Sequence, residues 1–400
     1  MNERPGIFCI TSYEKGQPFL REAHRLGADV YLLTMDRLRD GDWPRESLTE
    51  LHTMPEGLSA EQLRNTVSYL ARTRRIDRIV ALDEFDQENA AMLREHLRLP
   101  GMGVTAASYF RDKLAMRMRA QEAGVPVPEF TGVFHYDDVR AFMSAVPGPW
   151  LLKPRANASA IGIKKIEQAD ELWPVLEQLG DKQSEYLLER FVPGEVFHVD
   201  AVTWKGKVVF SAPHQYGQPP MRTMHEGGVF TTRRLHPESD DARALLELHE
   251  RVIAALGMVA GVTHTEFIRS SANGAFRFLE CAARVGGAHI ADVVEAASGI
   301  NLWAEWARIE IAQAQAEYRL PQVRHSYAGS VICLARQEWP DTSAYDDPEI
   351  IQRLSRRHHA GVIVQADEPE RVQELVESYG LRFWEEFGAS APVPTDRPTA

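Results

Sequence analysis

Two glutamates, Glu266 and Glu280, flank a predicted β-hairpin and could hold a metal ion. Residues 262–268 and 275–281 are rich in strand-forming side chains, and the Asn-Gly pair at 273–274 is typical of a hairpin turn. Folding about this turn sets the two carboxylates opposite each other, where like charges destabilise a sheet by up to about 1 kcal/mol. Magnesium would relieve the repulsion, because it binds one or two carboxylates together with water and phosphate oxygens. Two solvated glutamates on an edge hairpin are the alternative.

Two lysines upstream of the hairpin could bind phosphate groups. Lys113 opens an amphipathic helix that is predicted to end at Gly124. Lys153 ends an apolar strand and is followed by a loop of small residues at 156–162. Small residues let backbone N–H groups approach phosphate oxygens, and a lysine adds a compact positive charge. These segments shift the interpretation of the hairpin toward a metal–phosphate site.

A third segment, residues 189–195, has Glu189 at the end of a strand and Glu195 after a Pro-Gly turn. In this order the segments resemble the ATP-grasp superfamily, whose members hold ATP between two α+β subdomains. The resemblance covers about residues 106–320 and depends on the order and spacing of the motifs, since no single motif is specific. Residues 280–303 look most like carboxylate–amine ligases, particularly the L-amino-acid ligase group that joins two amino acids.

The resemblance implies a role for each position in binding ATP. Lys113 and Lys153 would contact the phosphates, and the loop that contains Ser159 and Gly162 would close over the β- and γ-phosphates. Backbone groups of a short linker would contact the adenine edge, and this linker consists of Glu189, Arg190, Phe191 and Val192.

The remaining positions would act on the ribose, the metal and the reacting groups. Glu195 would bind the ribose hydroxyls, while Glu266 and Glu280 would hold Mg²⁺, with Mn²⁺ as a possible substitute. Arg284 would stabilise the transferring phosphoryl group or an acyl phosphate. Phosphoryl transfer needs little else, because it depends on positioning and on neutralisation of charge.

The sequence departs from the family pattern in two places. Many relatives have an asparagine ligand two residues after the second metal glutamate, whereas this chain has Ala282, so the number of metal ions stays open. The glycine-serine pair of the phosphate loop is replaced by Ser159 and Ala160. Neither change removes a charge.

The composition describes an ordinary soluble globular protein. Of 400 residues, 44% are hydrophobic and 26% are charged, and the net charge is 45 − 57 = −12, which argues against nonspecific nucleic-acid binding. The three cysteines have no metal-binding spacing and favour reduced thiols in the cytoplasm. No apolar run reaches the length of a signal peptide or a membrane span.

The chain is expected to combine α/β and α+β parts. Residues 1–105 alternate strands and helices and predict a small parallel α/β domain. Residues 106–185 and 186–320 would be the two ATP-grasp subdomains, the second with the active site. Residues 321–400 predict a small α+β appendage with strands at 326–335 and 360–366, helices at 347–357 and 368–388, and a disordered tail at 391–400.

Two further segments have open interpretations. The acids Asp83, Glu84 and Asp86 follow a predicted strand and either cap the next helix or contact substrate. Residues 214–235 have no apolar period and predict a structureless substrate lid, with His225 as the preferred functional histidine. His214 and His264 are as well explained as ordinary strand residues.

The expected function is an ATP-dependent ligase that forms an amide or peptide bond through an acyl phosphate and releases ADP and phosphate. The substrates would be amino acids, or a small carboxylic acid and an amino acid; a homodimer is possible, and no nucleic acid or membrane partner is expected. Bicarbonate activation of the biotin-carboxylase kind and a non-catalytic ATP-binding module are the alternatives. Ala282 favours the module, whereas the retained glutamates, lysines and Arg284 oppose it.

Overall fold

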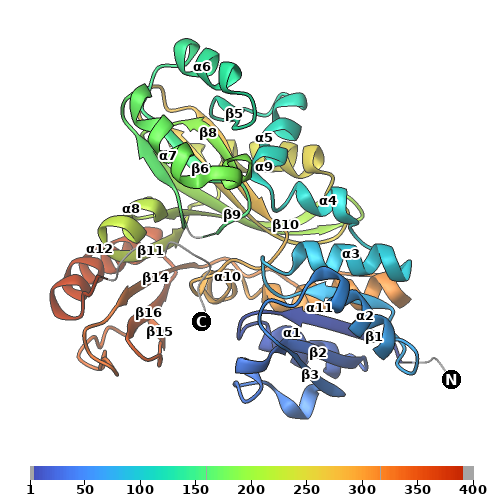
Figure 1. Ribbon diagram of the computed structural model, residues 1–400. Coiled ribbons are helices and arrows are strands. Elements are labelled where there is room, and N and C mark those ends of the chain that lie inside the picture. The colour runs from blue at the N-terminus through green and yellow to red at the C-terminus, as the bar shows by residue number, and fades with distance from the viewer. Residues whose placement is uncertain (1–3, 159, 316, 391–400) are drawn as a thin grey trace.

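The computed structural model describes residues 4–158, 160–315 and 317–390, with the side chains of 314 and 315 left out. At the bottom of Figure 1, the N-terminal residues form a parallel sheet in the order β3-β2-β1-β4. Its elements are β1 (Gly6–Thr11), α1 (Gln17–Arg25), β2 (Asp29–Met35), β3 (Glu50–Met54), α2 (Ala60–Leu70), β4 (Arg78–Ala81) and α3 (Gln87–Leu97). The predicted parallel sheet is present, and its edge strand β3 is largely half-buried and lacks an apolar run.

A second, antiparallel sheet has the order β5-β8-β6-β7 and lies near the top of Figure 1. This part of the chain contains α4 (Val104–Ser108), α5 (Lys113–Glu122), β5 (Phe130–Gly132), α6 (Tyr136–Ala145), β6 (Trp150–Pro154), β7 (Lys164–Ile166), α7 (Leu172–Leu179) and β8 (Tyr186–Arg190). Because β8 pairs with both β5 and β6, this sheet continues past residue 185 to Arg190.

The third sheet is antiparallel and has the order β13-β12-β9-β10-β11-β14-β16-β15. Its strands are β9 (Gly194–Trp204), β10 (Lys207–Tyr216), β11 (Val229–Arg234), β12 (Gly261–Ser270), β13 (Phe276–Ala282), β14 (Tyr327–Leu334), β15 (Ile350–Arg353) and β16 (His359–Ala366). The helices of this region are α8 (Pro220–Glu226), α9 (Asp240–Leu256), α10 (Ile290–Ser298), α11 (Leu302–Gln315) and α12 (Pro369–Glu386). Since β14 pairs with β11, residues beyond 320 extend this sheet; the predicted domain division stays a prediction.

Two local predictions were wrong. Residues 347–357 were expected to be helical, but β15 lies there and pairs with β16 at the edge of the sheet. Asp347 and Glu349 bind Arg371 of α12, and these ion pairs tie the segment to α12. The segment 214–235 was expected to be structureless, yet it contains the end of β10, the helix α8 and the strand β11. A proline at the start of α8 favours the helix, and the strand-forming residues of β11 favour the strand.

The N-terminal sheet and the large sheet share one apolar core through α11. Phe19 of α1 packs against Trp306 of α11 with the ring centroids 5.5 Å apart. Close by, Arg78 of β4 and Glu310 of α11 form a buried ion pair of 2.7 Å. In the parts of the chain described above, no helix is both long and apolar enough to cross a membrane. The predicted tail at 391–400 lies outside the described residues.

Candidate active site

The hairpin of β12 and β13 pairs Glu266 with Glu280, as its turn predicted. A bulge follows Glu266 and shifts the register by one residue. The repulsion between the carboxylates is offset by protein groups: Lys113 Nζ lies 2.8 Å from Glu280, and Tyr216 Oη donates to Glu266 Oε1 at 2.9 Å. Lys113 therefore supplies part of the positive charge that the two opposed carboxylates were expected to need.

Lys113 joins the hairpin to the loop at 156–162. Asp112 caps α5 by accepting from the backbone N–H of Leu114, and this fixes the first turn that carries Lys113. The ammonium also donates to the Asn157 carbonyl at 2.6 Å. In the loop, Gly162 has φ of +75°, a backbone conformation that favours glycine. Ser159 lies outside the described residues.

Lys153 belongs to a buried cluster of charged side chains that was not predicted from the sequence. Its ammonium is 2.6 Å from Glu189, and Arg117 of α5 binds the same carboxylate at 2.7 Å. Burial acts to raise the pKa of Glu189, but Arg117 and Lys153 outweigh it and hold that pKa below its usual value. Arg117 lies one helical turn after Lys113, and this spacing indicates that the two cations share one face of α5.

The predicted adenine linker continues from β8. The backbone N–H of Phe191 donates to the Pro149 carbonyl at 2.9 Å, and Arg190 pairs with Glu129 at 3.1 Å. Val192 is buried in the main core. Glu195, at the start of β9, pairs with Arg269 and accepts from Gln215 at 3.0 Å. A ribose hydroxyl would therefore share the Glu195 carboxylate with these partners.

Arg284 lies against the N-terminal sheet. Its guanidinium is 2.6 Å from Glu84, which also pairs with Arg111 at 3.2 Å. Burial acts to raise the pKa of Glu84, but Arg284 and Arg111 outweigh it and lower that pKa to about 2. Glu84 therefore binds both Arg284, which follows β13, and Arg111, which precedes α5.

The other two acids after β4 bind the end of β1 instead. Asp83 and Asp86 each accept from the Ser12 backbone N–H at 2.7 Å. Asp86 stands at the N-cap position of α3, but its side chain makes no capping hydrogen bond there. The capping interpretation is therefore wrong for Asp86.

His225 lies on α8, next to the loop at 156–162. Its Nε2 is 3.1 Å from the Ala160 carbonyl, and its side chain is exposed. This contact brings the predicted lid to the predicted phosphate loop, which are 65 residues apart in sequence. A catalytic role for His225 stays a prediction.

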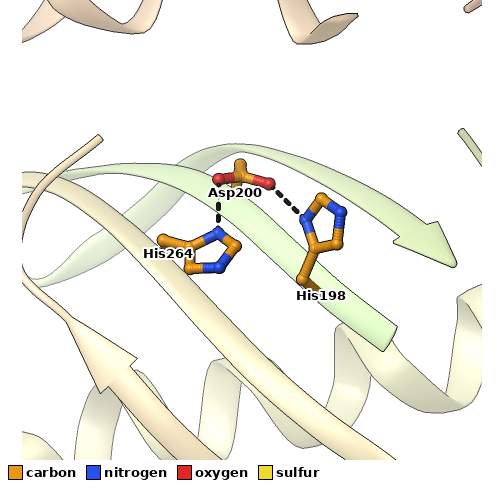
Figure 2. Close-up of side chains that lie close together, drawn as sticks. All are labelled: His198, Asp200 and His264. Carbon is orange, nitrogen blue, oxygen red and sulfur yellow. Dashed lines mark hydrogen bonds and ion pairs between the residues drawn. The ribbon is translucent and has the colours of Figure 1, made fainter. Parts of the chain in front are cut away.

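His198, Asp200 and His264 form a buried polar network that was not predicted, and Figure 2 shows these three side chains. Asp200 of β9 accepts from His198 Nδ1 at 2.6 Å and from His264 Nδ1 at 2.9 Å. Burial acts to lower the pKa of His264, but Asp200 and Glu266 outweigh it and raise that pKa to about 9. The alternation of side chains along a strand could have indicated this network. Residues 198 and 200 lie on one face of β9, and residues 264 and 266 lie on one face of β12.

Parts of the chain are similar in sequence to known proteins. A sequence family described as an ATP-grasp domain matches residues 146–292. An L-arginine-specific L-amino acid ligase of Bacillus subtilis is 26% identical over 242 residues, which are 59% of this chain and 58% of that relative. A D-alanine--D-alanine ligase of Neisseria gonorrhoeae is 32% identical over 106 residues, 26% of this chain and 35% of the relative.

The solved structure of an L-amino acid ligase from Bacillus licheniformis superposes with a TM-score of 0.74 at 19% identity. That superposition covers 98% of this chain and 100% of the other. It confirms the predicted combination of an N-terminal α/β domain with an ATP-grasp fold. The chain spans 58% of the length of the arginine-specific relative that it matches in sequence. The sequence match therefore identifies an ATP-grasp domain at residues 146–292, and the superposition shows that the chain has the same overall fold as the Bacillus licheniformis L-amino acid ligase.

Proposed function

We propose that this protein is an ATP-dependent ligase that joins a carboxylate to an amine through an acyl phosphate and releases ADP and phosphate. The observation that carries the proposal is that two opposed carboxylates lie next to a lysine suited to binding phosphate. Glu266 faces Glu280 across the hairpin, and Lys113 binds Glu280. Arg117 of the Lys153 group also donates to the Leu279 carbonyl, next to Glu280. The acids for a metal and the cations for phosphates therefore lie around one hairpin.

The two glutamates suit magnesium. One oxygen of each carboxylate is engaged, by Tyr216 at Glu266 and by Lys113 at Glu280, and no described residue donates a hydrogen bond to the second oxygens. Carboxylate oxygens are the donors that this hard cation prefers. When bound, magnesium would neutralise charge on the phosphate oxygens. Because residue 282 is alanine, water and phosphate would complete its coordination.

The reaction would proceed in two displacements. A carboxylate oxygen of the first substrate attacks the γ-phosphorus of ATP, the bond to the bridging oxygen breaks, and ADP leaves. Lys113 and Lys153 would hold phosphate oxygens during this step, and Arg284 would bind the acyl phosphate. The amine then attacks the acyl carbon, the bond to the phosphate oxygen breaks, and the nitrogen loses a proton as the amide forms.

The lid and the linker would complete the site. The backbone of residues 189–192 would contact adenine, Glu195 the ribose, and α8 with His225 would close over the acyl phosphate. Closure keeps water from hydrolysing such an intermediate. Amino acids, or a small acid with an amino acid, are the proposed substrates, because the curated relatives are named as ligases of amino acids. The cytoplasmic location and the homodimer stay predictions.

A screen for ADP release tests the proposal. The protein is incubated with ATP, magnesium and pairs of amino acids or small acids, and products are identified by mass spectrometry. We expect ADP release that needs both substrates, with an amide product whose mass is the sum of the two minus water. Release of ADP with bicarbonate alone, or ATP binding without turnover for every pair, would contradict the ligase assignment.

A further inference from the structure

We infer that Asp200 and His264 are positioning residues that orient Glu266, partly through Tyr216, and thereby determine how tightly the site binds its metal. This inference rests on the proposed role of Glu266 as a metal ligand. It concerns residues on β9, β10 and β12, none of which except Glu266 would touch the metal. Asp200, His264 and Tyr216 form a continuous chain of hydrogen bonds that ends on one oxygen of Glu266.

The chain begins at Asp200, which is 0% exposed. Its two oxygens accept from the Nδ1 atoms of His198 and His264, and the second ring nitrogen of His198 lies 2.7 Å from Thr232 Oγ1. Figure 2 shows both rings turned toward the same carboxylate. Because these polar atoms already have protein partners, the trio acts as a hydrogen-bonded support and is not assigned as a further metal site.

The chain ends at Glu266. His264 Nε2 is 3.3 Å from Tyr216 Oη and 3.6 Å from Glu266 Oε1, and Tyr216 donates to the same oxygen. Both contacts to Glu266 fall on Oε1, so the carboxylate is held by one oxygen and leaves the other open to a metal. Hydrogen-bonded groups behind a metal ligand typically change metal affinity by about 10- to 100-fold when they are removed.

Packing leaves the imidazoles little freedom to turn. The ring of His198 stacks on His214 with centroids 4.8 Å apart and lies 4.5 Å from the ring of Tyr216. On the other side, a Cβ at Gly286 would lie 2.9 Å from Asp200 Oδ1 and 3.0 Å from His264 Nδ1. Glycine at position 286 therefore permits the close approach of the Arg284 turn to the Asp200–His264 pair.

Three variants test the inference by a readout other than turnover. His264→Asn keeps a group that can bind Asp200 but does not reach Glu266, and Tyr216→Phe removes only the hydroxyl. Tyr379→Phe is the matched control for Tyr216→Phe, because Tyr379 is also a buried tyrosine whose hydroxyl donates to a carboxylate, that of Asp347, but it lies on α12 and outside this network. Binding of Mn²⁺ to the ADP complex is followed by electron paramagnetic resonance, and ADP binding without metal by calorimetry.

We expect His264→Asn and Tyr216→Phe to weaken Mn²⁺ binding by about tenfold or more, with metal-free ADP binding unchanged. Tyr379→Phe should leave Mn²⁺ affinity unchanged. Wild-type Mn²⁺ affinity in Tyr216→Phe would overturn the inference, and so would an equal loss in Tyr379→Phe. If His264→Asn does not fold, Tyr216→Phe decides. A protein that binds Mn²⁺ with ADP but forms no amide would refute the ligase proposal and leave this inference standing.

Discussion

The ammonium of Lys113 lies 2.8 Å from the carboxylate of Glu280, so a residue proposed to bind phosphate neutralises one proposed to bind metal. ATP and its metal would each offer the opposite charge to one member of this pair. When ATP and its metal bind, Lys113 would exchange Glu280 for a phosphate, and Glu280 would exchange Lys113 for the metal. Neither charge would then be left unpaired, and an unpaired charge is costly in a buried site. The pair would therefore link a bound nucleotide to the hairpin.

Lys113→Met should weaken ATP binding by about 10- to 100-fold, because a hydrogen bond to a charged group contributes roughly 1.5–3 kcal/mol. Calorimetric titration with ATP and magnesium measures this loss. Lys182→Met, which removes an exposed lysine outside the site, is the control and should bind as the wild type does. Unchanged affinity in Lys113→Met would contradict the phosphate role.

Glu189→Gln should destabilise the fold by about 3–5 kcal/mol, because Arg117 and Lys153 would stay buried without their shared carboxylate. Lys153→Met leaves Glu189 paired with Arg117 and should cost less stability while it weakens ATP binding. Urea unfolding of both variants makes the comparison. A larger loss of stability in Lys153→Met than in Glu189→Gln would show that the buried triad is not organised around Glu189.

The buried His249 of α9 should make the protein sensitive to acid. Neither ring nitrogen has a hydrogen-bond partner among the described residues, and burial, opposed only in part by Asp200, lowers the pKa of His249 from 6.5 to about 4. Between these values the unfolded chain binds a proton that the folded chain does not, so stability falls as the pH falls from 6.5 toward 4. This contribution amounts to about 3 kcal/mol over the whole window.

His249→Leu should therefore lose about 2 kcal/mol less stability than the wild type between pH 6.5 and pH 5.0. Urea unfolding at the two pH values measures the difference. His96→Leu, at an exposed helical position, is the control and should keep the wild-type dependence on pH. The same acid dependence in His249→Leu and in the wild type would show that another group is responsible.

The lid proposal predicts that ligands protect α8 from proteolysis. Because His225 already contacts the carbonyl of Ala160, ATP, magnesium and an acid substrate together should hold α8 against the phosphate loop. Limited proteolysis between residues 217 and 228, followed by mass spectrometry, should show slower cleavage with all three ligands than with ATP alone. Equal cleavage rates would mean that α8 is a surface connection only.

Local sequence patterns predicted the parts of the site that lie on one hairpin or one loop. The Asn-Gly turn at 273–274 predicted the hairpin, but the pairing of Glu266 with Glu280 also depends on the bulge after Glu266, which the turn does not specify. The order of the lysines and the loop predicted the fold as a whole. Helical spacing at 347–357 was misleading, since pairing with β16 at the sheet edge decided that conformation.

The charge partners could not be predicted, because they come from distant segments. Glu84 and Arg284 are 200 residues apart, and Arg117 and Glu189 are 72 apart. The support behind Glu266 combines side chains from four strands, β9 to β12, which only the sheet order brings together. Alternation along β9 shows that His198 and Asp200 share a face but not which residues they meet.

The central claim is that a carboxyl oxygen of the substrate is transferred to the γ-phosphoryl group, and isotope transfer tests it directly. The protein is incubated with ATP, magnesium, an ¹⁸O-labelled carboxylate substrate and the amine, and inorganic phosphate is analysed by mass spectrometry. Glu280→Gln, which should retain the fold but lose about 100-fold or more in turnover, is the control. We predict one ¹⁸O atom in the released phosphate, with ADP as the other product. Unlabelled phosphate, or AMP and pyrophosphate in place of ADP and phosphate, would contradict the account.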